Sequence, residues 1–441
     1  MRSIASLRFV ALVVVLFAAL SAPGRSAERL RAPEDVILIV VDTLRAKSLS
    51  LLGYGRETSP NLARFARDAI TYENAITPGT WTVPSHASLF TGLWPSFHGA
   101  ERVAADRILA TPINPKIETL AERLRRSGWA TGAFVANTTY LTPSLGFDRG
   151  FDAYVTDGGP ADVVGPAALR WLAQQRGHAF LFVNLLDPHE PYLPRQPYDT
   201  RFPGKNPELG DKITDLYWKG KPLTADVRRH FRSQYDGEIA FTDEVLADLF
   251  AQLREMGRYD DSLILLTSDH GEILGEHGLA GHGGAPYEEL LHVPLLVKLP
   301  GSRGGGARVE RRVSTMGVYA TILAAAGVTL PDETQSVPLE RPHPVWAEDV
   351  SFAGERVTVG YDGDRKLVHR IKPGADGAGA AEVFDLRADP REKKPADASA
   401  ASGLAASLET FRRTKRPRNE APPPVVDPER ERQLRELGYL H

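Results

Sequence analysis

Three places in the sequence carry side chains that suit the binding of a metal ion. Asp42 follows one apolar run, Asp269 and His270 follow another, and Thr82 lies in the hydroxyl-rich stretch GTWTVPSHASLFTG, residues 79–92. Carboxylate oxygen and imidazole nitrogen are ligands of Ca²⁺, Mn²⁺ and Zn²⁺. A hydroxyl that completes such a shell has a lowered pKa and becomes a nucleophile near neutral pH. These residue types therefore predict metal-assisted attack by Thr82 on an ester.

Each of these positions also has a purely structural interpretation. Asp42 could cap a following helix, and Asp269–His270 could simply open a turn. Thr82 is a candidate N-cap for a helix that begins near Pro84, with Ser85 as the alternative. Such a helix would itself suit chemistry, because its free N–H groups favour a bound phosphate or sulfate. The enzymatic interpretation therefore depends on whether the positions converge in the fold.

The candidate ligands follow runs that predict buried strands. Val36–Val41 and Leu263–Leu266 are continuous and apolar, as is the start of AFLFVNLLDPHEPY from Ala179. Runs of this kind are typical of strands whose two faces are both covered. A further strand is predicted at residues 130–136. Open α/β sheets bind ligands at the carboxyl ends of their strands, which is where this sequence places its acids and histidines.

Helical patterns separate these strands. Residues 119–128, TLAERLRRSG, and the long stretch from Arg228 to Gly257 carry apolar residues at helical spacing. SPNLARFARDA begins with Ser59 and Pro60, residue types that cap and start a helix. Strands that alternate with helices predict an α/β fold, in which a mostly parallel sheet is flanked by helices on both faces.

The chain divides into four predicted segments. Residues 1–27 are expected to be a signal peptide, 34–345 a catalytic α/β domain, 346–392 a C-terminal antiparallel subdomain, and 393–441 a linker with a terminal helix. The small antiparallel sheet is predicted from ERVTVGYDGDRKLVHRI, which reads as a hairpin with a polar tip at Asp362–Asp364.

The N-terminus and the composition indicate an exported protein. The apolar run Phe9–Leu20 is shorter than the roughly 20 residues of a spanning helix, and it fits a signal peptide. An uncleaved membrane anchor and a buried helix are the alternatives. The 441 residues include no cysteine, which fits a bacterial periplasmic or secreted protein and excludes a thiol nucleophile. A net charge of −3 gives no indication of nucleic-acid binding, and the oligomeric state is left open.

The ordered motifs resemble the sulfatase family of the alkaline phosphatase superfamily. The resemblance runs from Val36 to Pro300 and is carried by ILIVVDTLRA, LGYGRETSPNL, GTWTVPSHASLFTGLWPSFHG, SDHGEILGEHG and YEELLHVPLLVKLPG. EVFDLRADPRE is also similar to the closing hairpin of these enzymes. The resemblance implies an alkaline phosphatase-like fold and the hydrolysis of an ester with the help of a metal ion.

The resemblance assigns the metal ligands and the nucleophile. Asp42 matches the first metal-binding acid, and the pair Asp269 and His270 matches the late metal-binding pair. The family signature C-x-P-S-R aligns with residues 82–86, so that Thr82 stands at the position of the nucleophile and is expected to complete the metal shell.

Three histidines are implied to act on the substrate. His86 replaces the arginine of the signature, where it would help to neutralise the oxygens of the ester. His189 matches a substrate-facing histidine, and His282 matches a lysine or histidine near the leaving group. One of these two would protonate the leaving oxygen. His98 and His292, by contrast, are interpreted as structural.

Two departures from the family pattern bear on the chemistry. Thr43 stands where many sulfatases have a second aspartate, which favours Mn²⁺ or Zn²⁺ over Ca²⁺ as the single divalent ion. Thr82 stands where a cysteine or serine is oxidised to formylglycine. No formylglycine is expected here, because the Cβ of threonine carries a methyl group. The motifs are also similar to the phosphoethanolamine and lipoteichoic-acid type transferases, which use a threonine nucleophile.

The sequence therefore predicts a metal-dependent hydrolase of sulfuric, phosphoric or phosphonic esters. The alternatives are a phospho-group transferase to a lipid or glycan acceptor and a non-catalytic binding protein on a sulfatase scaffold. The expected substrate is an ester of a small molecule, a glycan or a lipid. Its alcohol would meet variable loops such as residues 195–220, where Tyr198, Tyr217 and Trp218 could stack on a ring or merely pack.

Polar residues outside these motifs receive weaker assignments. Asn137, which follows the strand at 130–136, is a candidate substrate contact. Four acids on the long helix are expected to form a solvated or buttressing face: Asp236, Glu238, Asp243 and Glu244.

Overall fold

The computed structural model describes residues 32–103, 109–375, 379–414, 416–417, 419–424, 431–432 and 434–435. The predicted signal peptide and most of the predicted terminal helix lie outside these residues, although 431–432 and 434–435 are helical. No helix in the described part of the chain is long and apolar enough to cross a membrane.

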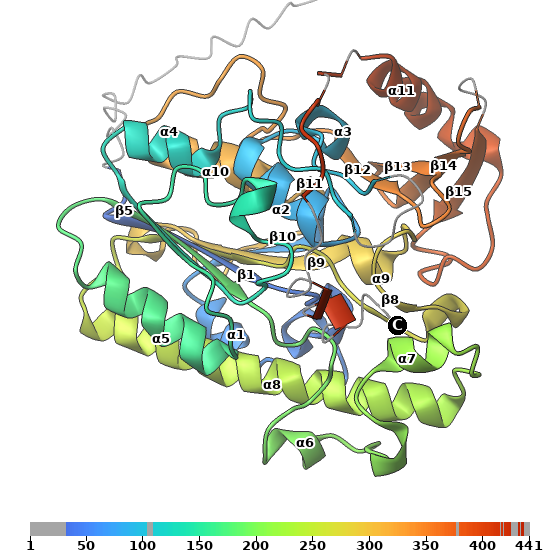
Figure 1. The fold of residues 1–441 in the computed structure, drawn as a ribbon, viewed down its shortest axis with the longest axis horizontal. Coiled ribbons are helices and arrows are strands. Elements are labelled where there is room, and N and C mark those ends of the chain that lie inside the picture. The colour runs from blue at the N-terminus through green and yellow to red at the C-terminus, as the bar shows by residue number, and fades with distance from the viewer. Residues whose placement is uncertain are drawn as a thin grey trace, which may run out of the picture. The chain divides into compact units, whose positions relative to one another are not determined.

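A large mixed sheet forms the centre of the fold (Figure 1). Its strands follow the order β10-β2-β9-β6-β1-β5-β3-β4, and β11 pairs with β2. The pairs β6/β1, β1/β5, β5/β3 and β3/β4 are parallel, whereas β9 runs antiparallel to β6 and β2. The strands are β1 (Asp35–Val41), β2 (Ile70–Ile76), β3 (Ala130–Val135), β4 (Ala153–Val155), β5 (Ala179–Leu185), β6 (Leu263–Thr267), β9 (His292–Lys298), β10 (Arg308–Val309) and β11 (Val313–Ser314).

Strand β1 shows why an uninterrupted apolar run is needed. Its seven residues are all buried, and successive side chains point to opposite faces of the sheet. Ile37 and Ile39 belong to one hydrophobic cluster, and Val36 and Leu38 belong to the other. The sheet therefore separates two cores, and the predicted α/β fold is confirmed.

Helices cover both faces of the sheet, as Figure 1 shows. The first cluster is closed by α1 (Pro60–Phe65), α5 (Ala161–Leu172) and α8 (Ala225–Glu255). The second is closed by α2 (Thr82–Thr91), α4 (Leu120–Arg126) and α10 (Gly317–Ala325). Shorter helices lie in the connections: α3 (Pro95–His98), α6 (Tyr198–Arg201), α7 (Ile213–Trp218) and α9 (Glu288–Leu291).

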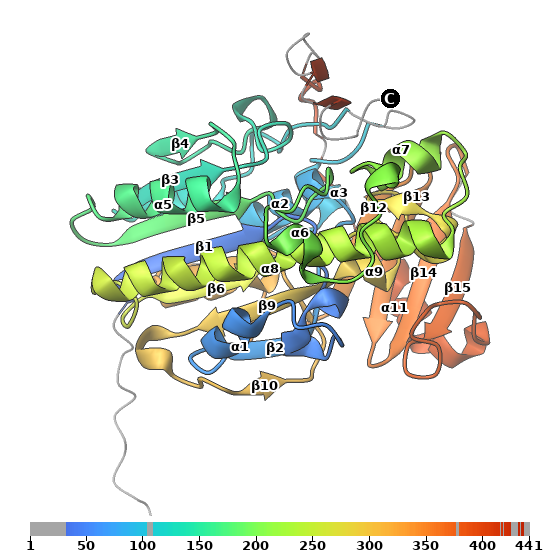
Figure 2. The same cartoon turned by 90° about the horizontal axis from the view of Figure 1, so that it is seen from below.

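The predicted C-terminal antiparallel sheet is also confirmed. It has four strands in the order β12-β13-β14-β15, namely β12 (Val345–Val350), β13 (Arg356–Asp362), β14 (Arg365–Ile371) and β15 (Ala380–Asp385). The hairpin β13–β14 turns at the expected polar tip, whereas β12 was not predicted. Helix α11 (Ser402–Arg413) lies against this sheet (Figure 2). Phe411 of α11 stacks on Trp346 with 5.3 Å between ring centroids.

A buried ionic cluster joins the two sheets. Lys366 of β14 lies 3.0 Å from Glu288 of α9 and 2.6 Å from Glu392, and all three residues are buried. The hydroxyl of Tyr361 donates to the same oxygen of Glu288 over 2.6 Å. Removing one partner from a buried cluster of paired, hydrogen-bonded charges strongly destabilises the folded protein.

The structure corrects the predicted cap of helix α1. Ser59 occupies the N-cap position and Pro60 the first helical position, but the Ser59 hydroxyl instead contacts Ser50. Asp243 of α8 takes over the capping role, because its carboxylate accepts from the amides of Asn61 and Leu62 at 2.8 and 2.7 Å.

The acids of helix α8 therefore act as buttresses rather than as a solvated face. Asp243, Asp236 and Glu238 are buried, and Asp236 binds the guanidinium of Arg56 at 2.8 Å. Only Glu244 among the four is exposed.

Candidate active site

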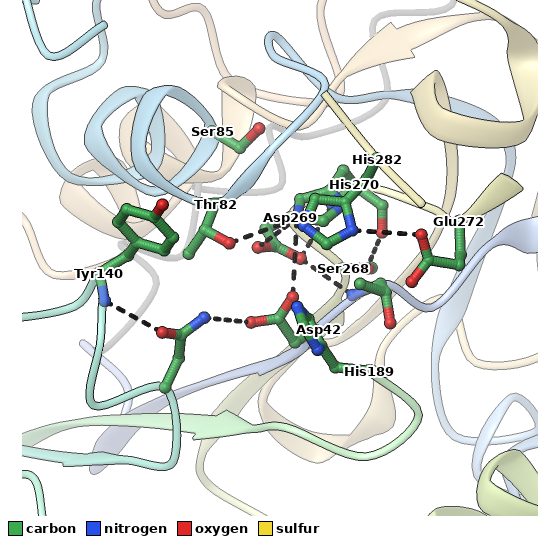
Figure 3. Close-up of polar contacts among 12 residues, drawn as sticks. Asp42, Thr82, Ser85, Tyr140, His189, Ser268, Asp269, His270, Glu272 and His282 are labelled. Atoms are coloured by element: carbon green, nitrogen blue, oxygen red, sulfur yellow. Dashed lines mark hydrogen bonds and ion pairs between the residues drawn. The ribbon is translucent and has the colours of Figure 1, made fainter. Parts of the chain in front are cut away.

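The topology brings the predicted ligands to one edge of the sheet (Figure 3). Asp42 follows β1, and its amide extends the ladder by donating to the carbonyl of Leu185 at 2.8 Å. Asp269 and His270 follow the adjacent parallel strand β6. Because parallel strands end on the same side, residues far apart in sequence become neighbours here. The convergence required by the sequence analysis is therefore found.

The four predicted metal-binding residues surround one point. His270 Nε2 lies 3.6 Å from Asp42 Oδ1, 3.3 Å from Asp269 Oδ2 and 3.4 Å from the Thr82 hydroxyl oxygen. The ligand atoms of Asp42, Asp269 and His270 all lie within 4.8 Å of one another. All four side chains are fully buried, and Figure 3 shows the Thr82 hydroxyl directed at this group.

The hydrogen bonds leave one atom of each carboxylate for a cation. Asp42 Oδ2 accepts from the amide of Asn137 at 2.9 Å, whereas Asp42 Oδ1 has no hydrogen-bond partner. Asp269 Oδ1 accepts from the backbone amides of Thr43 and His270 at 3.3 and 2.9 Å, whereas Asp269 Oδ2 has none. Buried carboxylate oxygens normally need a partner, so these atoms fit the binding of a divalent ion.

His270 is prepared for the same role. Its Nδ1 lies 2.9 Å from the carbonyl oxygen of Gly271, which fixes the proton on Nδ1 and leaves the lone pair of Nε2 free. Burial, followed by the charge of His282, lowers the pKa of His270 well below its usual value. The ring is therefore in the neutral form that binds metal ions.

The pKa values of the two carboxyl groups, Asp42 and Asp269, are shifted in the opposite direction. Burial raises the pKa of Asp42, and burial together with the nearby Asp42 raises the pKa of Asp269 well above its usual value. Two buried carboxylates this close repel one another. A bound cation removes that repulsion, so the site favours a positive charge at its centre.

Helix α2 places Thr82 at the site. The helix begins at Thr82 itself, with Trp81 as the N-cap residue, so Thr82 is not the N-cap of a helix that starts near Pro84. Its side chain is thus free to face the ligands instead of capping a backbone amide. The preceding loop approaches closely, because a Cβ atom on Gly79 would lie 2.9 Å from the hydroxyl oxygen of Ser85.

His86 is buried one helical turn after Thr82. It lies behind Thr82, with its Nδ1 2.9 Å from the Thr82 carbonyl oxygen and 3.4 Å from Asp269 Oδ2. Burial lowers the pKa of His86 to about 4, so the ring is neutral near pH 7. The neutral ring contacts the backbone of Thr82 and lies close to Asp269. A role of His86 in neutralising the oxygens of a bound ester stays a prediction.

His189 and His282 lie beside the ligand group and line a neighbouring cavity. Their ring centroids are 5.0 Å apart, and the His282 ring is 4.5 Å from that of His270. Glu272 Oε1 lies 3.1 Å from His282 Nδ1, which fixes the tautomer of that histidine. Burial, followed by the charge of His189, lowers the pKa of His282 well below its usual value.

The sequence analysis missed two residues that hold this site. Asn137 was considered as a substrate contact, but its amide binds Asp42. Glu272 was not singled out, although it comes two residues after His270 and is fully buried, and a buried acid beside a predicted ligand is a usable signal. His98 and His292 are structural as expected, since His98 contacts Ser88 and the Pro84 carbonyl, and His292 contacts the Glu73 carbonyl.

The C-terminal sheet also reaches this site. Asp349 of β12 accepts a hydrogen bond from the hydroxyl of Thr80, two residues before Thr82. The same carboxylate oxygen accepts from the amide of Gly284 at 2.6 Å, two residues after His282. Asp349 therefore connects the loops that carry the hydroxyl and the histidine.

The family model described as Sulfatase matches residues 34–328. The chain belongs to the sulfatase family. It is 26% identical to the multifunctional alkaline phosphatase superfamily protein PehA of Trinickia caryophylli, a match that spans 68% of this chain and 74% of that protein. It is 22% identical to an arylsulfatase of Clostridium perfringens, with 81% and 89% of the two chains matched.

Solved structures share the fold of this sulfatase-family chain. The phosphonate monoester hydrolase of Agrobacterium radiobacter superposes with a TM-score of 0.70 at 22% identity, over 86% of this chain and 95% of that one. The structure of BT4656 in complex with its substrate D-glucosamine-2-N,6-O-disulfate gives a TM-score of 0.68 at 18% identity, over 86% and 97%. The family confirms the predicted class of enzyme, a hydrolase of sulfuric or phosphoric esters.

Proposed function

We propose that this chain is a metal-dependent hydrolase of sulfuric, phosphoric or phosphonic esters in which Thr82 is the nucleophile. One observation carries the proposal: the Thr82 hydroxyl lies 3.4 Å from His270 Nε2, beside two carboxylate oxygens that have no hydrogen-bond partner. The similar solved structures include a phosphonate monoester hydrolase and a protein in complex with a sulfated sugar as its substrate. This supports a proposal that covers both phosphonic and sulfuric esters.

Asp42, Thr82, Asp269 and His270 are the residues that would hold one divalent ion, with Ca²⁺, Mn²⁺ and Zn²⁺ as candidates. Such an ion lowers the pKa of a bound hydroxyl and stabilises developing negative charge. The protein fixes the orientation of these four groups through Asn137, through the backbone amides that hold Asp269, and through the Gly271 carbonyl.

The chain supplies the remaining steps with its own groups. The Thr82 hydroxyl gives up its proton to water, and its oxygen forms a bond to the sulfur or phosphorus atom as the bond from that atom to the leaving oxygen breaks. The amides in the first turn of α2 favour the oxygens of the anionic ester. His282 donates a proton to the leaving oxygen, with Glu272 holding the ring. Burial lowers the pKa of His282. A bound anionic ester raises that pKa, because its negative charge favours the protonated imidazolium.

Hydrolysis of the covalent ester formed on Thr82 favours phosphorus over sulfur. Threonine has one hydroxyl and a methyl group on Cβ, so it cannot form the formylglycine hydrate that expels sulfate with its second hydroxyl. A phosphoryl or phosphonyl ester of Thr82 is released by a second in-line attack of water at phosphorus. A sulfuryl ester of Thr82 requires the corresponding attack of water at sulfur.

Hydrolysis of matched nitrophenyl sulfate, phosphate monoester, phosphate diester and phosphonate tests the proposal. The wild-type protein loaded with Mn²⁺ is expected to turn over at least one of them, Thr82→Ala to lose turnover while it still binds Mn²⁺, and Thr82→Ser to retain turnover. Thr91→Ala is the control on the same helix, since the Thr91 hydroxyl only contacts the Ala87 carbonyl. Full activity of Thr82→Ala would contradict the proposal.

The same experiment separates the two alternatives. A phospho-group transferase would release nitrophenol only when a lipid or glycan acceptor is added, and inorganic phosphate would not accumulate. A non-catalytic binding protein would bind Mn²⁺ without releasing nitrophenol from any of the four esters. The buried, unpaired oxygens of Asp42 and Asp269 fit a bound ion under either interpretation. The Thr82 hydroxyl directed at the same point favours the hydrolase over the binding protein.

A further inference from the structure

The chain returns from helix α11 to the loops that carry the candidate active site. The side-chain amide of Asn419 donates to the carbonyls of Gly99 and Pro112, at 3.1 and 2.8 Å. Leu434 is fully buried, and it belongs to the hydrophobic cluster that also contains Trp81, the N-cap residue of α2. The described residues near the C-terminal end are therefore packed onto the part of the fold that bears the nucleophile.

Arg435 brings the chain to the wall of a cavity. The ammonium group of Lys212 donates to the Arg435 carbonyl at 3.0 Å, and Lys212 immediately precedes α7. Thr214, two residues further on, lines a cavity of about 870 Å³. The next residues of the chain, 436–440, span up to about 16 Å when they are extended. They are therefore long enough to enter this cavity.

The cavity has a polar end and an apolar body. The polar end, beside the ligand group, consists of three residues: His189, Glu272 and His282. The apolar body comes from α7, from the ribbon of β7 (Ile273–Leu274) and β8 (Ala280–Gly281), and from Phe352 after β12. Trp218 of α7 and Phe352 meet edge to face, with 6.1 Å between ring centroids. Such a body suits large apolar side chains and aromatic rings.

We propose that this cavity is the docking site of the chain's own residues 437–440, and that the docked segment covers the candidate active site. The segment reads Leu-Gly-Tyr-Leu, so it offers two aliphatic side chains, one aromatic ring and no charge. The described residues that line the cavity include Glu190 and Glu272 but no Lys or Arg. An uncharged segment therefore suits the cavity better than an anionic one, which would meet two carboxyl groups.

A docked segment would regulate the enzyme by competing with its substrate. This part of the inference rests on the proposed function, because both the segment and the ester need the space beside His282. A segment that is docked for about nine-tenths of the time would lower the apparent affinity for the ester about tenfold, since only the open fraction of the protein binds it. The chemical step in the open fraction would be unaffected, so docking would raise KM and leave kcat unchanged.

Disulfide trapping in the full chain tests the docking directly, because the native chain contains no cysteine. Tyr439→Cys is combined in turn with Trp218→Cys, Leu279→Cys or Ala285→Cys, each of which replaces a residue that lines the cavity. Two cysteines form a disulfide only when their Cα atoms come within about 7 Å. After mild oxidation, we expect mass spectrometry to find an intramolecular disulfide in at least one of the three pairs. Thermal unfolding of each variant verifies that its fold is retained.

Tyr198 supplies the matched control. It belongs to the same 195–220 segment as Tyr217 and Trp218, but its ring packs on Phe241 of α8 with 5.7 Å between centroids, and it does not line the cavity. Of the three aromatic residues that the sequence analysis considered for stacking on a ring, Tyr217 and Trp218 line the cavity. Tyr198→Cys combined with Tyr439→Cys should give no intramolecular disulfide.

The outcomes separate the docking from the proposed hydrolase. Absence of an intramolecular disulfide from all three pairs, or an equal yield in the Tyr198→Cys control, overturns the docking even when the nitrophenyl esters are hydrolysed. Disulfide-linked dimers alone also overturn it, and assign the segment to the cavity of a second copy. A trapped disulfide in a protein that hydrolyses none of the esters supports the docking and contradicts only the hydrolase.

Kinetics of the full chain test the regulatory part. Tyr439→Ala removes the aromatic ring of the segment, and we expect KM for a hydrolysed nitrophenyl ester to fall by about tenfold while kcat stays unchanged. Tyr198→Ala should leave both constants unchanged. An unchanged KM in Tyr439→Ala would show that the segment does not compete with the substrate.

Discussion

Asn137 donates a hydrogen bond to Asp42 at 2.9 Å, and this contact decides which oxygen of Asp42 faces the ligand group. The donor occupies Oδ2, so that Oδ1 is the atom directed at His270 Nε2, 3.6 Å away. Asn137 follows β3, two strands from β1, and it thus positions a ligand from across the sheet. Residues of this kind fix the orientation of a ligand without touching the ion.

Replacing Asn137 with Ala should therefore weaken metal binding without removing a ligand. We expect the dissociation constant for Mn²⁺ to rise by about tenfold to a hundredfold, as measured by calorimetric titration of metal-free protein. Asn74→Ala is the control, because Asn74 lies on β2, three strands from β1, and its amide donates to the Glu310 carbonyl at 2.8 Å. Unchanged Mn²⁺ affinity in Asn137→Ala would show that Asp42 is oriented by other contacts.

Glu272→Gln should affect catalysis according to the leaving group. The carboxylate holds His282 Nδ1 at 3.1 Å, and an amide can keep the ring in place without stabilising its positive charge. We expect kcat to fall by about 10²-fold for a phenyl ester and far less for a nitrophenyl ester, whose leaving oxygen needs little protonation. KM should stay within twofold. Equal losses with both esters would argue against proton donation by His282.

Thr43→Asp should change the preferred metal ion. Thr43 adjoins Asp42 and adopts a backbone φ of +55°, a left-handed conformation that is unfavourable for a β-branched residue and tolerated by Asp and Asn. A further carboxylate suits Ca²⁺, which takes more oxygen ligands than Zn²⁺. We expect the affinity for Ca²⁺ relative to Mn²⁺ to rise by about tenfold. Thr43→Asn relieves the same strain without adding charge, so a rise in both variants would exclude the carboxylate as the cause.

Lys366→Met should destabilise the protein because it leaves two buried carboxyl groups, Glu288 and Glu392, without their ammonium partner. The loss in unfolding free energy is expected to be about 3–5 kcal/mol, measured by urea denaturation at pH 7. The control is Lys219→Met, whose exposed pair with Asp215 contributes within about 0.5 kcal/mol. A loss below about 1 kcal/mol in Lys366→Met would show that the ionic cluster does not stabilise the fold.

The pH dependence of stability tests the same cluster. Burial by itself raises the pKa of Glu288, but the charges of Lys366 and then Arg312 outweigh it and lower that pKa to about 2. A folded-state pKa below the unfolded value means that Glu288 stabilises the native state above pH 4.5, and that this contribution is lost as the pH falls from 4.5 towards 2. In Lys366→Met the loss over this range should become smaller, with the remainder due to Arg312, which lies 3.5 Å from Glu288. An unchanged acid slope of the unfolding free energy in that variant would assign the effect to other groups.

The main sheet and the convergence of the candidate metal ligands were predictable because the sequence signal is local. A strand such as Val36–Val41 must be apolar throughout when both of its faces are covered, and an acid directly after it marks the carboxyl edge. Asp42 and the Asp269–His270 pair were identified in this way. The start of helix α2 was less certain, because Thr82, Ser85 and Pro84 all suit the beginning of a helix.

The remaining parts depend on contacts between distant segments. Asp243 caps helix α1 from 181 positions away, so no local pattern around Ser59 could reveal it. The neutral state of His86 follows from complete burial, which the type of the residue does not indicate. The sequence left Tyr198, Tyr217 and Trp218 equivalent, and only the packing of α6 against α8 separates the first from the other two.

The two hydrogen bonds of Asp349 have a consequence for the boundary of the catalytic unit. One carboxylate oxygen of Asp349, on a strand of the second sheet, accepts hydrogen bonds from both the loop before Thr82 and the loop after His282. A fragment that ends after residue 345 would keep every metal ligand and every histidine of the site, yet lose the clamp that sets the spacing between them. Variants in which the chain is cut or exchanged between the two sheets should therefore bind metal but lack turnover. The two sheets together form the smallest catalytic unit.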